Sequence, residues 1–280
     1  MTAYPKYLII LLLASLLICC ADNGEPTMEA TPFTSFQDGF EATGTRLAQL
    51  LPRDNSRWTS IQVVDPPGGD NFLRLDMERF IEGSASLRVV AAPTTDVVSK
   101  ANIEKGGFFA PSGHRVRVQA ELYIEATESL ENLFLIDLEC CSCWDASVAD
   151  NQCPGVRLKL SDAEGFLSIE RGKILGSTIS QSGVAFPTDE WVKVVWEMDL
   201  SPSDDGWNRL YINGRQVIDE AGKNLPNAGE FAAEFARNGI DFQLREPVGY
   251  ERVQIGATAN SSAGPVELWV DDFVLEITEL

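Results

Sequence analysis

The chain has 280 residues, with 22 lysines and arginines, 42 aspartates and glutamates and a single histidine, so its formal net charge is −20. This charge argues against nucleic acid as a partner, because the summed field of the protein would repel a polyanion. One histidine excludes a multi-histidine zinc site. Apolar residues make up 44% of the chain, which is enough for a sizeable core.

The first residues predict an export signal. Residues 8–18 are apolar except for Ser15, and Cys19 and Cys20 follow directly. The apolar run is shorter than the roughly 20 residues of a membrane-spanning helix, and it fits the apolar part of a secretory signal.

The end of this run resembles a bacterial lipoprotein signal, in which a cysteine is lipidated and becomes the new N-terminus. We therefore predict a signal peptide over residues 1–19, lipidation of Cys20 and a flexible tether over residues 20–35. The protein is then expected on the extracytoplasmic side of the bacterial cell envelope, held to the membrane by its lipid alone. An ordinary cleaved signal with two incidental cysteines is the alternative.

From residue 36 onward, alternation of apolar and polar residues with period two dominates the sequence. It is clearest over residues 116–124, where valine, alanine, leucine and isoleucine alternate with arginine, glutamine, glutamate and tyrosine. Other strand-like runs are 58–64, 71–75, 85–91, 133–140, 156–160, 165–170, 191–199, 209–213, 250–257 and 266–277. Asn213-Gly214 predicts a tight hairpin, and residues 228–238 alone favour a helix.

Many short strands with one short helix predict an all-β fold, a sandwich of two antiparallel sheets formed by residues 36–280. The last strand changes phase, because its apolar residues are even-numbered up to Val270 and odd-numbered from Phe273. A β-bulge at Asp271-Asp272 would keep both halves facing the core.

Several segments resemble concanavalin A-like, laminin-G-like jelly rolls. They are Phe36–Glu41 followed by Trp58, Gly83–Val89, Trp191–Trp196, Leu210–Arg215 and Trp269–Phe273. The resemblance implies a jelly-roll fold, and this architecture hosts lectins, hydrolases, lyases and adhesion modules alike. It also implies a structural calcium ion between the first and last strands, with Glu41 and Asp272 as ligands and Asp38 or Asp271 as further candidates.

The strand at residues 133–140 carries the candidate catalytic acids. Strict alternation places Leu133, Leu135, Asp137 and Glu139 on one face. Laminarinase-like hydrolases of this fold use three acids at alternate positions of one strand, and Leu135 stands where the resemblance implies the nucleophile. Retaining hydrolysis needs two carboxylates about 5 Å apart, so this mechanism is disfavoured.

A jelly-roll lyase would need basic residues to neutralise a uronate and a histidine or tyrosine for proton transfer. Arg115 and Arg117 share one strand face with Tyr123 and are the candidates for this chemistry. His114, the single histidine, is in step with inward-facing valines, which favours a structural role.

Four cysteines, Cys140, Cys141, Cys143 and Cys153, surround Trp144. Their spacing is not that of a zinc ribbon, and export favours oxidation, so we expect two disulfides. Pairing Cys140 with Cys141, or Cys141 with Cys143, would close a strained ring, which leaves Cys140–Cys143 with Cys141–Cys153. The stapled loop would present Trp144 as an exposed platform, and Trp207 is the second tryptophan expected at the surface.

These observations predict a non-catalytic, lectin-like lipoprotein whose partner is a cell-surface glycan. Asp137 and Glu139 would accept hydrogen bonds from sugar hydroxyls, and Trp144 would stack on a sugar ring. The alternative is a divergent polysaccharide lyase or glycoside hydrolase of the same fold, using these acids with Arg115, Arg117 or Tyr123. A structural or protein-adhesion module is the third hypothesis.

Overall fold

The structure of the protein is a computed structural model, which describes residues 33–125, 129–145, 147, 153–172 and 177–280. The expected signal peptide and Cys20 lie outside the described residues. The described residues form one compact unit that runs to the C-terminus, and its first strand begins at Ser35. The described part of the chain contains no helix with the length and hydropathy needed to cross a bilayer.

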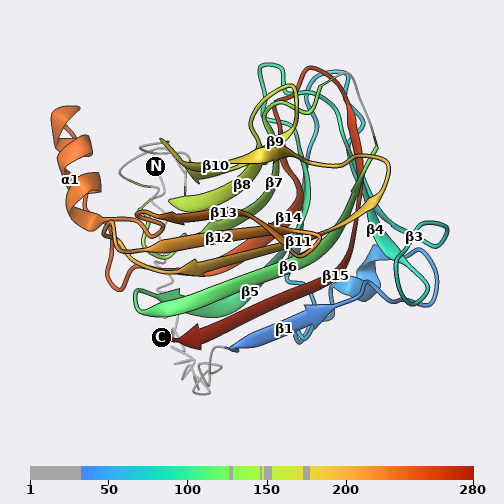
Figure 1. Ribbon diagram of the computed structural model, residues 1–280, viewed down its shortest axis with the longest axis horizontal. Helices are drawn as coiled ribbons and strands as arrows, with labels where there is room; N and C mark the ends of the chain where they lie inside the picture. The colour runs from blue at the N-terminus through green and yellow to red at the C-terminus, as the bar shows by residue number, and fades with distance from the viewer. Residues whose placement is uncertain (1–32, 126–128, 146, 148–152, 173–176) are drawn as a thin grey trace, which may run out of the picture. The chain divides into compact units, whose positions relative to one another are not determined.

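The described unit is a sandwich of two antiparallel sheets (Figure 1), as the alternation predicted. The strands of sheet A lie in the order β13 (Arg215–Ala221), β12 (Trp207–Ile212), β11 (Trp191–Asp199), β6 (His114–Ile124), β15 (Val266–Glu279), β4 (Ser86–Ala91) and β3 (Phe72–Asp76), and β1 (Ser35–Asp38) also pairs with β15. The strands of sheet B lie in the order β10 (Ser177–Ala185), β9 (Phe166–Gly172), β8 (Gly155–Leu160), β7 (Leu133–Glu139), β14 (Gly249–Asn260), β5 (Lys100–Pro111) and β2 (Ser60–Val64).

The core lies between the sheets and is filled by one face of each strand. In β6, Val116, Val118, Ala120 and Leu122 are buried, whereas the arginines and glutamine between them are partly exposed. At one end, the indole of Trp58 stacks on Phe40 and contacts Phe36 and Phe273. Burial of these aromatic side chains supplies much of the hydrophobic stabilisation and fixes how the first and last strands meet.

The phase change in β15 is a β-bulge, as predicted. Pairing of β15 with β6 shifts register between Asp271 and Val274, and Asp272 has a φ of 44°. The extra residue lets Val270 and Phe273 both face the core, where each is fully buried. The tight hairpin is also present, since Asn213 and Gly214 have φ values of 50° and 77°, as a type I′ turn requires.

A second bulge, in β7, was not predicted. Leu133 and Phe134 pair with Leu160 and Lys159, but the next paired residue is Ile136, so Leu135 is the extra residue. Leu133 therefore faces the core, and Phe134 lies on the same face as Asp137 and Glu139. The expected single face of Leu133, Leu135, Asp137 and Glu139 is wrong, because one inserted residue reverses the alternation on one side of it.

Strands β5 and β10 are absent from the predicted runs, and β13 is implied only by the predicted hairpin at Asn213-Gly214. β5 contains Glu104 and Lys105, which are buried, and Gly106-Gly107, which resembles a turn but forms a bulge against β14. β10 is polar over most of its length and pairs irregularly with β9 at an edge of the sheet. Neither segment shows the clean alternation of a strand that has one apolar and one polar face.

The disulfide loop after β7 packs inward, onto the helix. The structure joins Cys140 to Cys143 and Cys141 to Cys153, the pairing expected from the sequence. Trp144 is 4% exposed and its ring lies 4.5 Å from Phe242 and 5.6 Å from Phe235, which belongs to α1 (Ala228–Arg237). The helix begins at Asn227, whose side chain accepts a hydrogen bond from the Glu230 amide.

This packing makes Trp144 a core residue. We expect Trp144→Ala to lower the free energy of unfolding by roughly 3–5 kcal/mol, the usual cost of truncating a buried tryptophan. Urea denaturation followed by circular dichroism measures the effect. Trp207→Ala, at a partly exposed position, is the matched control and should cost about 1 kcal/mol or less. An unchanged unfolding midpoint in Trp144→Ala would contradict this placement.

Candidate functional site

The outer face of sheet B, turned away from the core, carries the densest group of buried polar side chains. Strand register places there Gln62 of β2, Asn102 and Glu104 of β5, Arg252 and Gln254 of β14, Asp137 and Glu139 of β7, Arg157 and Lys159 of β8, and Ser168 and Glu170 of β9. Each of these residues pairs across the sheet with a neighbour in this set or with a glycine. Acidic and basic side chains thus alternate across five strands, and this face is our candidate functional site.

A network centred on Gln254 joins β5, β14 and β7. The Gln254 amide nitrogen donates to Glu104 Oε2 and to Glu139 Oε2, each at 3.1 Å. Arg252 lies 3.3 Å from Glu104 Oε2 and 3.9 Å from Glu139 Oε2, and Gln62 donates to Glu104 at 3.2 Å. The Arg252 side chain is 32% exposed, whereas the two glutamate side chains are 10% and 4% exposed. Arg252 is therefore the accessible charge above a buried acidic pair.

A second group lies on β7 and β8. Asp137 accepts a hydrogen bond from the Thr258 hydroxyl at 2.9 Å and lies 3.9 Å from Arg157. Lys159 forms an ion pair with Glu170 at 2.6 Å, and the ring of Phe134 lies about 5 Å from both cations. The bulge at Leu135 is what brings this ring to the outer face, where its π-electrons hold the two cations in place.

Several buried polar atoms of this face have no protein partner among the described residues. They are both amide atoms of Asn102, Oε1 of Gln254 and Oγ of Ser168, in residues that are at most 1% exposed. Unpaired buried polar atoms are rare and costly, so water or a polar ligand is the expected partner. Their concentration on one sheet face distinguishes it from an ordinary solvated surface.

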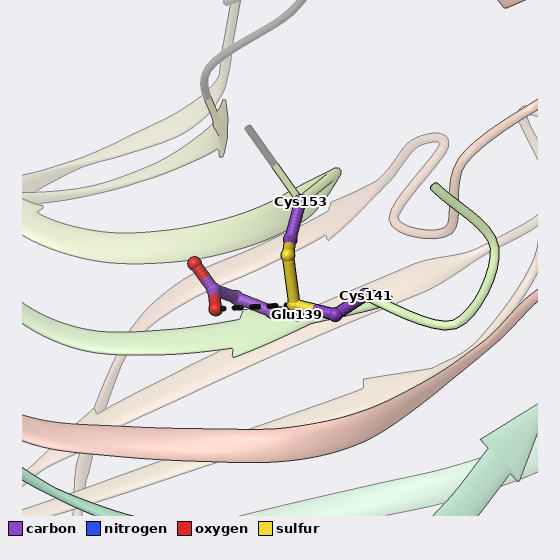
Figure 2. A group of neighbouring side chains, drawn as sticks. All are labelled: Glu139, Cys141 and Cys153. Carbon is purple, nitrogen blue, oxygen red and sulfur yellow. Dashed lines mark hydrogen bonds between the residues drawn. A yellow bond between two sulfur atoms is a disulfide. The ribbon is translucent and has the colours of Figure 1, made fainter. Parts of the chain in front are cut away.

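The disulfide between Cys141 and Cys153 borders this site (Figure 2). Its sulfur atom Sγ of Cys141 lies 3.7 Å from Oε2 of Glu139. These three side chains are the one group of potential metal ligands that the described residues bring within 4.8 Å. Sulfur in a disulfide carries neither a proton nor a thiolate charge, so the group does not fit a metal and the contact is not a hydrogen bond. The disulfide instead fixes the chain beside Glu139.

The basic and aromatic residues expected to act with Asp137 and Glu139 lie on the opposite sheet. Arg115, Arg117 and Tyr123 are on β6 and Trp207 is on β12, all on the outer face of sheet A. There, Arg115 pairs with Asp199 at 2.5 Å and the Trp207 indole donates to Asp219 at 2.5 Å. The expectation that these residues form one site with the two acids is wrong, because the core separates the two faces.

The prediction that Trp144 forms an exposed sugar platform is also wrong, because this side chain is buried against α1 and Phe242. The described outer face of sheet B also contains neither histidine nor tyrosine. His114, Tyr123 and Tyr211 belong to sheet A, and Tyr250 of β14 points into the core, where its hydroxyl donates to the Asn224 carbonyl at 2.5 Å. Burial raises the pKa of Tyr250 far above its usual value.

Three of the four acids expected to bind calcium, Asp38, Glu41 and Asp271, are held by protein groups, and Asp272 is the fourth. Asp38 receives two hydrogen bonds from the guanidinium of Arg57. Glu41 accepts from the amide and hydroxyl of Ser84, and Asp271 accepts from the amides of Ile81 and Asp272. Because these carboxylate oxygens already accept hydrogen bonds from the protein, they do not fit a calcium site, which needs six to eight free oxygens. Calcium binding at this corner stays a prediction.

Asp271 itself is fully buried at the bulge. Burial raises its pKa from 3.8 to about 6, against the opposing effect of the two backbone amides. The pKa values of the neighbouring Asp272 and Glu121 are raised too, mainly by burial, with a further increase from nearby carboxylates and an opposing effect of Lys193. Protonation of these carboxyl groups therefore stabilises the folded protein.

Comparison with known proteins extends to the fold alone. No family model matches the chain, and no curated protein matches its sequence. Among solved structures, an endo-β-1,4-glucuronan lyase from the fungus Trichoderma reesei is similar, with a TM-score of 0.57, 9% identity, and coverage of 78% of this chain and 90% of the lyase. The cellulose-induced protein Cip1 has a TM-score of 0.56 and 16% identity, over 88% of this chain and 97% of that one.

Alginate lyase Aly36B is a third similar structure, with a TM-score of 0.51 and 13% identity over 88% of this chain and 98% of the lyase. These neighbours are jelly-roll sandwiches, and two of the three are polysaccharide lyases. The chain therefore has a jelly-roll fold that known carbohydrate-active proteins share.

The buried Asp271 predicts a pH dependence of stability. Its carboxyl binds a proton more tightly in the folded protein, with a pKa of about 6, than in the unfolded chain at 3.8. Lowering the pH from 7 to 4 should therefore stabilise the wild type relative to Asp271→Asn, by at most about 3 kcal/mol. The benefit is complete below pH 4 and lost above pH 6. Denaturant unfolding of both proteins across this range measures it, and parallel profiles would contradict the assignment.

Proposed function

We propose that the protein binds a uronate-containing polysaccharide on the outer face of sheet B and cleaves it by β-elimination. The observation that carries the proposal is the acid–base network around Arg252 and Gln254, with its unpartnered amide atoms. The similarity in fold to a glucuronan lyase and an alginate lyase supports this class of substrate over a neutral glycan. The proposal therefore follows the carbohydrate-active alternative of the sequence analysis rather than its lectin-like hypothesis.

β-Elimination requires three groups in the site. A cation must neutralise the uronate carboxylate, a base must take the proton from C5, and an acid must protonate the oxygen that leaves when the C4–O bond breaks. Arg252 is suited to the first task, because it is partly exposed and oriented by Glu104 and Glu139. Lys159 is the candidate acid for the leaving oxygen, since its ammonium group lies on the same face, beside Arg157 and over the ring of Phe134. Its ion-pair partner Glu170, at 2.6 Å, is the candidate base for the C5 proton.

One observation favours a second function, binding without cleavage. The described residues of the face include no histidine and no tyrosine, the side chains that most readily exchange protons with a sugar at neutral pH. Under this alternative, the same network recognises the polymer, and no bond breaks.

Incubation of the full chain with polyglucuronate, alginate and polygalacturonate separates the two functions. Elimination creates a C4=C5 double bond, so cleavage is measured as a rise in ultraviolet absorbance, and binding by co-sedimentation with the polymer. We expect cleavage that falls at least about 100-fold in Arg252→Ala and in Lys159→Ala, the usual scale for loss of electrostatic or acid–base catalysis.

Arg209→Gln, on the outer face of sheet A, is the matched control and should retain the activity. Binding without any absorbance change in the wild type would establish the non-catalytic alternative. Absence of both signals on every acidic polymer would overturn the proposal.

Anchoring at Cys20 is the second part of the proposal, and it rests on the signal-like sequence before it. We expect palmitate labelling of the protein in a bacterial host to be lost in Cys20→Ser and retained in Cys19→Ser. Labelling that disappears in the Cys19 variant alone would move the anchor by one residue. Labelling in neither the wild type nor either variant would favour an ordinary cleaved signal.

A further inference from the structure

A row of directly paired side chains crosses the outer face of sheet A. Arg74 of β3 pairs with Arg88 of β4, which pairs with Trp269 of β15, and Trp269 pairs with Tyr123 of β6. The row ends at Trp191 of β11. Its β3 end is unusual, because two arginines stand directly opposite one another, an arrangement that costs stability in an antiparallel pair.

The acidic residues of the chain only partly neutralise this arginine pair. Arg88 forms an ion pair with Glu267, but its buried Nε has no hydrogen-bond partner. Arg74 is exposed, and no described carboxylate lies within ion-pair distance of its guanidinium, although acidic residues outnumber basic ones by 42 to 22. The Cζ atom of Arg74 lies 5.4 Å from the centre of the Phe72 ring. Both arginines thus retain unused donors.

These donors line a cavity of about 410 Å³ formed by β3, β4, the residues that follow β3 and Thr45. Asp76 lies in the same cavity, but its two oxygens already accept the Glu78 amide and the Trp269 indole, each at 2.8 Å. The lining also includes the side chains of Thr45, Glu78 and Met77. The cavity therefore combines two guanidinium groups, the hydroxyl of Thr45, the carboxylate of Glu78 and the apolar side chain of Met77.

We propose that this cavity binds the carboxylate of an acidic sugar, with Arg74 and Arg88 as the groups that recognise it. A guanidinium fork matches a carboxylate in two parallel hydrogen bonds, and a carboxylate between the arginines relieves their repulsion. Thr45 and Glu78 are suited to the hydroxyl groups beside it. This site lies on the opposite sheet from the proposed cleavage site and is independent of that reaction.

The test uses the full chain and methyl glucuronoside, which has no glycosidic bond at O4 and so cannot be cleaved by elimination. Binding is followed by ligand-observed NMR, with methyl glucoside as the neutral control. We expect the glucuronoside alone to bind, and Arg74→Gln to weaken binding by roughly tenfold or more, as loss of a charge-assisted pair does. Arg115→Gln is the matched control, because that arginine lies on the same face but is paired with Asp199.

Thermal unfolding separates a binding role from a structural one. Removing one of two facing arginines should leave the melting temperature of Arg74→Gln unchanged or higher, whereas a structural role predicts a lower value. Equal glucuronoside affinity in the wild type and Arg74→Gln, or absence of binding to the wild type, would overturn the inference. Loss of binding in Arg252→Gln alone would place the sugar on sheet B and overturn it as well.

Discussion

A side chain on a strand of this protein lies either in the core or on the outer surface of its own sheet, and this constraint decides which polar residues can act together. Asp137 and Glu139 act with residues of β5, β14 and β8 because those strands flank β7 in sheet B. The arginines of β6, although closer in sequence than β14, are excluded because they face away from the other sheet. The β-bulges at Leu135 and at Asp271-Asp272 modify the constraint, since each inserts one residue and reverses the facing of everything on one side.

The glutamates on the outer face of sheet B are buried although burial of a charged carboxylate is costly. Hydrogen bonds and a neighbouring arginine offset this cost. A buried carboxylate without partners is costly, but Glu104 accepts from Gln62 and Gln254 and lies beside Arg252. Glu139 shares Gln254 and Arg252 with it. Because one amide and one guanidinium serve two acids, removal of either leaves a charge uncompensated. A group of this kind is expected where a polar surface must keep a fixed shape for a ligand.

The sequence predicts most of the architecture because period-two alternation reports burial directly. It finds the regular strands of both sheets, the helix, the hairpin at Asn213-Gly214 and the bulge at Asp271-Asp272, where the phase change lies within one apolar strand. It misses β5, because the buried Asn102 and Glu104 on the outer side of this strand are polar and break the expected alternation. The burial of Glu104 is tolerated because Gln62 and Gln254 donate hydrogen bonds to it, and the local sequence does not show these partners. It also misses the bulge at Leu135, because every neighbour is apolar and no phase change is visible.

The site was harder to predict, because it is assembled across strands. The acids of β7 were identified, but Gln254 and Arg252 are distant in sequence and carry no local motif. Tryptophan positions did not locate the site either, because Trp144 follows three cysteines and a serine in a loop and yet lies in the core. Burial of a loop residue depends on what packs over it, and that information is absent from the local sequence.

The two faces differ in how they can attract an acidic polymer. On sheet B, Arg157, Lys159 and Arg252 all lie beside internal carboxylates, so a uronate must compete with them, and exchanging one ion pair for another gains little. Affinity there has to come from hydroxyl groups meeting unpartnered amides and from repetition along the chain. On sheet A, Arg74 has no such competitor, so a single carboxylate gains a partner without displacing one. The two proposals together assign retention of the polymer to sheet A and its cleavage to sheet B, where Arg252 is oriented and partly exposed.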